Sequence, residues 1–276
     1  MSDILLSNKL KDTLLCQASK LPNSVALCLS GGIDSVALLF TLQKANKLIT
    51  VYSFTLSDVE SYDYQVAKQL SDMFNLKFIG IKLSTNVDDL KADVQILHDI
   101  YGCRKKTEYE CVWPFLSLYP KVSESVVVTG LGAEGHFGTT KSCAIHYKND
   151  LDVFRNQFFS NSNVSEIHQH KLLANKYFKD LWFPFLTKDI RSLFIGTSWD
   201  SINKPHLKQI ILDAFQDDFE NLPITLKSAN LQLNSGISKH FEKLLQTDWN
   251  VRNYKSVVGI FNQVNKGMYN GKRKLI

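Results

Sequence analysis

The sequence predicts an α/β fold, a doubly wound parallel sheet with a C-terminal helical cap, and three observations support this. Short apolar runs alternate with helix-like stretches as far as Thr129, which is the pattern of repeated strand-helix-strand units. Two of these runs end in glycine-bearing turns, and strand-like runs stop at about Leu151. The chain has 276 residues, of which 44% are hydrophobic, so it can bury a full core.

The predicted elements follow in order from the N-terminus. Apolar residues at helical spacing predict a leading helix over residues 3–20, and Leu21-Pro22-Asn23 ends it. Strands and helices then alternate, beginning with a short apolar strand of the kind that is buried on both faces. These predicted elements are Val25–Leu29, Ser35–Ala45, Leu48–Leu56, 62–75, Leu76–Leu83, 86–102 and Val126–Thr129.

The second half of the chain reads as helical. We expect residues 1–150 to form an α/β core and residues 151–276 a mainly helical portion packed on it as one compact unit. Ligands of a doubly wound sheet gather beyond the carboxyl ends of its strands, so both glycine turns should share one crevice. The later predicted helices are Leu151–Phe159, Ser165–Lys179, Lys188–Phe194, His206–Phe215, Ser238–Gln246 and Val251–Lys266.

Composition excludes several classes of protein. No run of 18 apolar residues exists and the first 24 residues are mixed in polarity, so we expect a soluble, cytoplasmic protein without a membrane partner. The five cysteines lack CxxC pairing, which argues against a disulfide framework and a four-thiolate zinc site. A net charge of +5 suits an anionic substrate but supports nucleic-acid binding only weakly.

The first glycine turn, Ser30-Gly31-Gly32-Ile33-Asp34-Ser35, has the composition of a phosphate cradle. After a strand, such a turn lets backbone amides approach an anion, and the next helix points its unpaired amides at the same place. A plain tight turn would account for the glycines but not for Asp34 and Ser35. The sequence contains neither the GxxxxGK[ST] of a P-loop nor the GxGxxG of a dinucleotide fold.

The pattern S-G-G-x-D-S after an apolar strand resembles that of the PP-loop ATP pyrophosphatases. The resemblance implies an adenine nucleotide alpha hydrolase-like fold in which the turn grips the pyrophosphate of ATP while a substrate oxygen attacks the α-phosphorus. It also implies ATP and Mg²⁺ as cofactors, with Asp34 holding the metal. The implied ATP- or pyrophosphate-binding residues are Leu29, Ser30, Gly31, Gly32, Asp34, Ser35, Phe54, Gly130 and Gly132.

Within that superfamily, later segments resemble the synthetase domain of asparagine synthetases. The stretch VVVTGLGAEGHFG, residues 126–138, is similar to that family's strand followed by S/T-G-E/D-G-A/S-D-E-x-F-G-G. Pro184-Phe185-Leu186 matches its PFLD anchor, and KPHLKQIILDAF places Lys208 on a family lysine near the ATP phosphates. The resemblance covers roughly residues 24–240 and implies catalytic roles for Lys208 and Glu134, with Glu134 as a second metal ligand.

The chain departs from that family on the substrate side. Leu131 and Gly135 replace acidic residues of the second turn, and Leu212 replaces the arginine of the K-x-x-L-R pattern. In the closing segment, residues 228–230 read Ser-Ala-Asn where the family has R-x-K. The chain also lacks a preceding glutaminase domain, so we expect ammonia to be free or delivered by a partner, or an amine to be present on the substrate.

Three functions follow from these residues. The first is an ATP-dependent carbon–nitrogen ligase that adenylates a small-molecule carboxylate and passes it to ammonia or an amine, with AMP and pyrophosphate released. The second is an enzyme that adenylates a nucleobase of tRNA or a deazapurine, and the third is a degenerate, non-catalytic nucleotide-binding module. His136, the basic run 104–106, Glu108 and Glu110 are weaker site candidates, since most such residues serve local structure.

Overall fold

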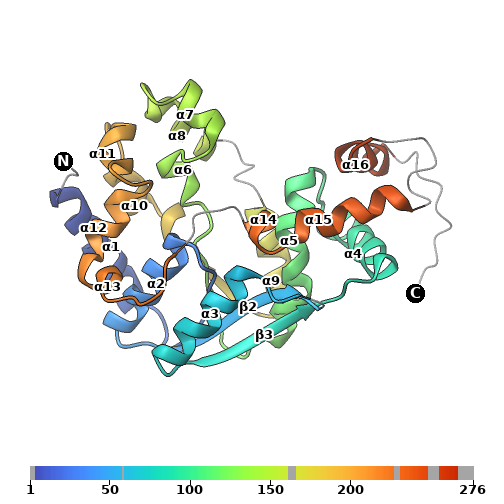
Figure 1. Cartoon of the computed structure of the whole chain (residues 1–276), viewed down its shortest axis with the longest axis horizontal. Coiled ribbons are helices and arrows are strands. Elements are labelled where there is room, and N and C mark those ends of the chain that lie inside the picture. The colour runs from blue at the N-terminus through green and yellow to red at the C-terminus, as the bar shows by residue number, and fades with distance from the viewer. Residues whose placement is uncertain (1–3, 58, 161–165, 227–230, 248–254, 267–276) are drawn as a thin grey trace.

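The computed structural model describes residues 4–57, 59–160, 166–226, 231–247 and 255–266. Its centre is a five-stranded sheet with the strand order β3-β2-β1-β4-β5, and every neighbouring pair is parallel (Figure 1). The strand order reverses between β1 and β4, and in such sheets this position opens a crevice at the carboxyl ends. The strands are β1 (Ser24–Cys28), β2 (Leu48–Leu56), β3 (Lys77–Leu83), β4 (Val126–Val128) and β5 (Asp180–Trp182).

Helices cover both faces of the sheet, as the predicted fold class requires. The longer ones run from α1 to α5 in the first half of the chain, and shorter ones follow. Their bounds are α1 Ile4–Ser19, α2 Ile33–Lys44, α3 Tyr62–Met73, α4 Val87–Asp99, α5 Lys106–Leu118, α6 Glu134–Phe137, α7 Lys141–His146, α8 Leu151–Ser160, α9 Ile167–Lys176, α10 Lys188–Leu193, α11 Trp199–Asn203, α12 Gln209–Ala214, α13 Gln216–Glu220, α14 Leu231–Asn234, α15 Ile237–Phe241 and α16 Val257–Asn265.

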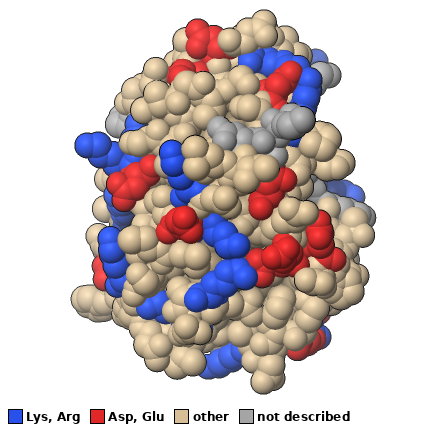
Figure 2. Space-filling model, turned by 90° about the vertical axis from the view of Figure 1, so that its left-hand side faces the viewer, with Lys and Arg blue, Asp and Glu red and all other residues tan. Residues whose placement is uncertain are grey.

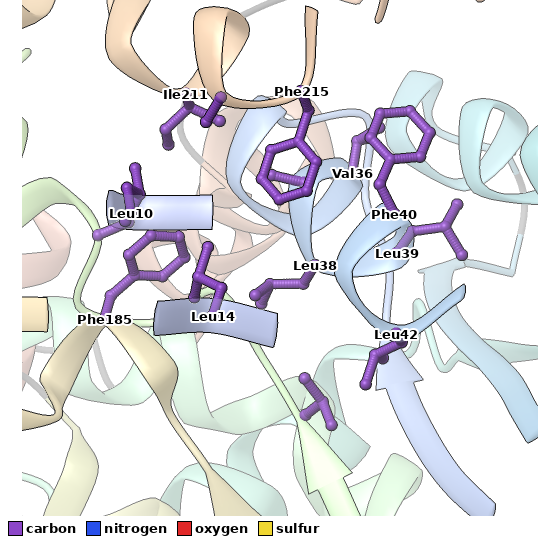
Figure 3. Packing of buried hydrophobic residues seen from close by; sticks show 14 of the residues in the cluster. Leu10, Leu14, Val36, Leu38, Leu39, Phe40, Leu42, Phe185, Ile211 and Phe215 are labelled. Carbon is purple, nitrogen blue, oxygen red and sulfur yellow. The ribbon is translucent and has the colours of Figure 1, made fainter. Parts of the chain in front are cut away.

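Alternate residues of the central strands belong to two separate apolar clusters, one on each face of the sheet. Val25 and Leu27 of β1 face the cluster built by α1, α2, α3, α10 and α12, whereas Ala26 faces the cluster built by α4, α5, α9, α15 and α16. All three residues are fully buried, which explains why β1 reads as an unbroken apolar run. Figure 3 shows the first cluster, where Leu14 of α1, Leu38 of α2 and Phe215 after α12 lie together.

The expectation that strands stop at about Leu151 was wrong. β5 pairs in parallel with β4, with Val127 opposite Leu181, and it forms the edge of the sheet. A strand of three residues is too short to show a period in the sequence, and its aromatic surroundings resembled cap packing. α5 was also missed, because Pro114 and a run of aromatic and β-branched residues within it are poor predictors of a helix.

The remaining predicted elements agree with the structure at their centres. The leading helix and the second strand are present, the latter with the predicted bounds. The helix predicted to begin at His206 begins only at Gln209, because Lys208 adopts a left-handed backbone conformation with φ of 61°. Parts of two predicted helices, around Ser165 and over residues 251–254, lie outside the described residues.

One face of the molecule carries charges of both signs. Figure 2 shows Lys and Arg interspersed with Asp and Glu on the side of Figure 1 where α1 and α10 to α13 lie. Asp200 of α11 bonds both Lys148 and Lys204, at 3.0 and 2.7 Å, so part of the positive charge is neutralised locally. Within the described ranges, every helix is too short or too polar to cross a membrane.

Candidate active site

The first glycine turn joins β1 to α2 and is closed by its own serine hydroxyls. The Ser35 hydroxyl lies 2.9 Å from the Gly32 carbonyl oxygen, to which it donates, and it accepts from the Ser30 amide at 3.2 Å. The Ser30 hydroxyl accepts from the Gly32 amide at 3.2 Å. The two serines therefore fix the shape of the turn. The first amides of α2 have no partner within that helix and are the groups that can meet an anion.

Lys208 reaches this turn from a distant part of the chain. Its Nζ lies 2.5 Å from Asp34 Oδ2, across a sequence separation of 174 residues. The side chains are only 11% and 20% exposed, so the pair is largely shielded from water. The structure thus brings together two residues that separate motifs had predicted. Asp34 was predicted to bind pyrophosphate and metal, and Lys208 was predicted to lie near the ATP phosphates.

The backbone of Lys208 is held by a buried amide side chain. Asn203, 2% exposed, accepts from the Lys208 amide at 2.9 Å and donates to the Phe137 carbonyl oxygen at 2.8 Å. Phe137 ends α6, which follows the second glycine turn, and its ring lies 5.7 Å from Lys208 Nζ. Asn203 therefore links the lysine to the second turn. Sequence reasoning missed this residue, which has no motif around it.

The second glycine turn packs directly on the first, so the predicted proximity of the two turns is confirmed. A Cβ added to Gly130 would lie 3.2 Å from Asp34 Cβ and 3.5 Å from the Ser35 amide nitrogen. Gly132 has a φ of 90°, and a Cβ there would lie 2.2 Å from Leu186. Only glycine fits either position without displacing a neighbour, so the PFL anchor and both turns form one packed unit.

Glu134 does not contact Asp34 through any bond that the structure shows. One of its carboxylate oxygens accepts from the Thr139 hydroxyl and the other accepts from the Thr140 amide at 3.0 Å. Both oxygens are thus occupied by the turn that follows α6. The predicted catalytic and metal-binding role of Glu134 would require these bonds to be exchanged for others.

The donor atoms at the turn suit a hard cation in part. Asp34 Oδ1 is buried and has no hydrogen-bond partner among the described residues, while Oδ2 pairs with Lys208. A free carboxylate oxygen is a ligand that Mg²⁺ accepts, and Mg²⁺ in ATP sites takes its other ligands from phosphates and water. The described residues contain no group of three or more acidic, His or Cys side chains that could hold a metal without such help.

Two other predicted ATP-binding residues are buried in the core. Leu29 is 3% exposed, and its amide donates to the Tyr52 carbonyl oxygen at 3.0 Å, which extends the pairing of β1 with β2. Phe54 is 8% exposed and packs edge-on against Phe115 of α5, with ring centroids 6.0 Å apart. Both side chains therefore belong to the buried core next to the turns.

The altered position Gly135 has a packing reason. A Cβ there would lie 2.3 Å from Phe158 and 2.8 Å from Phe159, which are at the end of α8. Aromatic rings thus occupy the space that an acidic side chain would need. Leu131 is half-buried in the second turn and Leu212 half-buried in α12, so the departures from the family pattern are accommodated in an ordered structure.

The weaker candidates serve local structure. His136 is fully buried between aromatic rings, bonds the Phe185 carbonyl oxygen through Nε2 at 2.5 Å, and has its pKa lowered to about 4 by burial. Glu108 caps α5 by accepting from the Arg104 and Lys105 amides. Lys106 pairs with the buried Glu110 at 2.6 Å.

None of the buried cysteines is poised as a nucleophile. None of the five cysteines forms a disulfide. Burial raises the pKa of Cys28 and Cys103 to about 12 and that of Cys143 to about 11, so the reactive thiolate form is disfavoured at each.

Comparison with known proteins places these features in context. The family model for asparagine synthase matches residues 11–188. A search of curated proteins finds no match.

Three solved structures are distantly similar. U34-tRNA thiolase NcsA from Methanococcus maripaludis, solved with its 4Fe-4S cluster, is 13% identical, with a TM-score of 0.40 and coverage of 98% of this chain and 80% of that one. A predicted subunit of tRNA methyltransferase from Methanocaldococcus jannaschii is 16% identical, with a TM-score of 0.36 and coverage of 72% and 90%. NMN synthetase from Francisella tularensis is 16% identical, with a TM-score of 0.34 and coverage of 89% and 95%.

Proposed function

Because the chain belongs to the asparagine synthase family, we propose that it is an ATP-dependent ligase that adenylates a carboxylate and transfers it to ammonia or an amine. The observation that carries this proposal is the contact of Lys208 with Asp34 in the glycine turn. A lysine and a carboxylate held together at the turn are the groups needed to bind the pyrophosphate of ATP and its metal.

The proposed reaction has two steps. In the first, a substrate carboxylate oxygen attacks the α-phosphorus of ATP, a new oxygen–phosphorus bond forms, and the bond to the bridging α–β oxygen breaks to release pyrophosphate. In the second, a nitrogen lone pair attacks the acyl carbon, the carbon–oxygen bond to AMP breaks, and the nitrogen loses a proton. The products are an amide, AMP and pyrophosphate.

Positioning and charge neutralisation supply most of the catalysis in such a reaction. Lys208 and the first amides of α2 would hold the departing pyrophosphate. Mg²⁺, when bound, would neutralise phosphate charge, and Asp34 Oδ1 is the group available to hold it. The ion pair seen here would then open, with Asp34 turning to the metal and Lys208 to the phosphates.

The residues that line a hollow beside the second turn support the proposal that the substrate is anionic. It measures about 350 Å³ and lies against Leu186, which also contacts Gly132. Lys171 and Arg191 line it, and no acidic residue is among its described lining residues. Neither cation has an ion-pair partner in the described part of the chain, so both can balance a carboxylate.

The test is the release of pyrophosphate and AMP from ATP and Mg²⁺ in the presence of ammonia and a panel of carboxylates, with tRNA in a parallel reaction. Lys208→Ala and Asp34→Ala should each lower the rate at least about 100-fold, as the loss of an electrostatic group does in other enzymes. Lys204→Ala is the matched control, because Lys204 is 57% exposed and bonds Asp200 on the surface.

The outcomes separate the proposal from its alternatives. Pyrophosphate released only with tRNA would replace it by nucleobase adenylation. ATP binding without pyrophosphate release under any condition would indicate a non-catalytic nucleotide-binding module.

A further inference from the structure

A buried carboxylate in the first turn of α3 lies against the first glycine turn. Asp63 is 6% exposed, and a Cβ added to Gly31 would lie 3.1 Å from its Oδ1. Burial raises the pKa of Asp63, while the Asn234 side chain and the Gly31 backbone amide act to lower it. The glycine at position 31 therefore lets the turn approach Asp63.

The same carboxylate is bonded from a distant part of the chain. Asn234 Nδ2 donates to Asp63 Oδ1 at 3.1 Å, across 171 residues. The neighbouring Tyr62 makes a parallel connection, because its ring would lie 3.3 Å from a Cβ at Gly31 and its hydroxyl donates to the Thr225 carbonyl oxygen. Two consecutive residues, Tyr62 and Asp63, thus contact the glycine turn on one side and bond Thr225 and Asn234 on the other.

Asp63 is not needed to cap its own helix. The Ser61 side chain caps α3 by accepting from the Tyr64 amide at 3.3 Å. A buried carboxylate in the first turn of the helix carries a desolvation cost that capping by Ser61 does not require. Its contacts with Gly31 and Asn234 account for its position.

We propose that Asp63 is a positioning residue for the glycine turn. It holds Gly31 in the conformation that receives pyrophosphate, and Asn234 holds Asp63, so that the turn and the chain around Asn234 are ordered together. This inference rests on the proposed function for its effect on ATP, but the ordering of the turn is a property of the protein without ATP.

The first experiment measures ATP affinity by calorimetry with Mg²⁺ and the KM for ATP in pyrophosphate release. Asp63→Ala should weaken binding about 10- to 100-fold, the worth of hydrogen bonds to a charged group, with a smaller change in kcat. Asp63→Asn keeps one acceptor oxygen and should lie between Asp63→Ala and the wild type. Asp72→Ala, an exposed aspartate near the end of the same helix, should bind ATP as the wild type does.

A second set of variants tests the link to Asn234. Asn234→Ala should weaken ATP binding about three- to tenfold, and the double variant with Asp63→Ala should be no weaker than Asp63→Ala alone, because the two side chains act as a unit. Fully additive effects would overturn the link. If Asp63→Ala does not fold, Asn234→Ala alone still tests whether this link affects ATP binding.

Hydrogen exchange without ATP distinguishes failure of this inference from failure of the proposed function. The Gly31 and Gly32 amides should exchange faster in Asp63→Ala and in Asn234→Ala than in the wild type, with the amides of β1 unchanged. If the wild type does not bind ATP, the proposed function is refuted. Exchange of the Gly31 and Gly32 amides then still tests whether Asp63 orders the turn. Unchanged exchange and unchanged ATP affinity in folded Asp63→Ala would overturn the inference.

Discussion

At the residue scale, Asp34 is surrounded by groups from three parts of the chain. Its Cβ lies against Gly130, its Oδ2 pairs with Lys208, and its own turn is closed by the two serine hydroxyls. Local sequence predicted Asp34 and the serines because their spacing is itself a motif. Asn203 and Asp63 were not predictable in that way, because each acts through contacts with segments far away in the sequence.

Gly135 provides a prediction at this scale. Gly135→Ala should lower the free energy of unfolding by about 1–3 kcal/mol, the usual cost of overpacking, because the new methyl group would meet the Phe158 ring. The measurement is denaturant unfolding followed by fluorescence. In a Phe158→Ala background the same substitution should cost much less, and an equal cost in both backgrounds would contradict the packing explanation.

At the scale of elements, α8 holds α6 and the end of α10 through one buried guanidinium. Arg155 is 5% exposed and donates to the His136 carbonyl oxygen through Nε and Nη2, and to the Phe194 and Thr197 carbonyl oxygens through Nη1. Burial lowers the pKa of Arg155, while Asp152, bonded at 2.7 Å, acts in the opposite direction. These bonds fix the short helix that follows the second glycine turn.

Arg155→Ala should therefore destabilise the protein by about 3–5 kcal/mol, because it leaves buried carbonyl oxygens unpaired and Asp152 without its partner. Arg155→Lys should recover little, since an ammonium group cannot reach three carbonyl oxygens in a planar fork. Thermal unfolding monitored by circular dichroism measures both variants. A lysine variant as stable as the wild type would show that charge alone suffices.

At the scale of the whole molecule, the buried His136 and His170, whose pKa values burial lowers to about 4 and about 3, make stability depend on pH. His170 is 3% exposed, bonds the Tyr119 hydroxyl at 3.0 Å, and has its pKa lowered to about 3 by burial. Its neutral form is thus favoured in the folded state, while the unfolded chain takes up a proton near pH 6.5. The stability that this histidine contributes is present above pH 6.5 and is lost as the pH falls toward 3.

The expected size of this loss is about 3 kcal/mol at pH 4 for His170. Unfolding free energies measured from pH 7 to 4 should fall less steeply for His170→Gln than for the wild type. His168→Gln is the control, since His168 is exposed on the same helix. Parallel pH profiles for His170→Gln and the wild type would contradict the prediction.

Much of the fold could be predicted because its central strands carry strong patterns. β1 is an apolar run after Ser24, and β2 is rich in β-branched and aromatic residues, so both strands were evident from the chain alone. β5 could not be predicted, since three residues at a sheet edge depend on pairing with β4 rather than on their own pattern. The site followed the same rule: the turns were readable, whereas the bonds that occupy Glu134 depend on tertiary packing.

The separation of Asp34 from Lys208 has a consequence for synthesis on the ribosome. A ribosome adds about 5–20 residues each second, so the 174 residues between them take roughly 9–35 s to emerge. The glycine turn and its sheet neighbours β2 and β3 leave the exit tunnel long before the lysine does. During that interval the nascent chain carries the Asp34 carboxylate without its cation, so the pyrophosphate site proposed above is complete only after Lys208 has emerged.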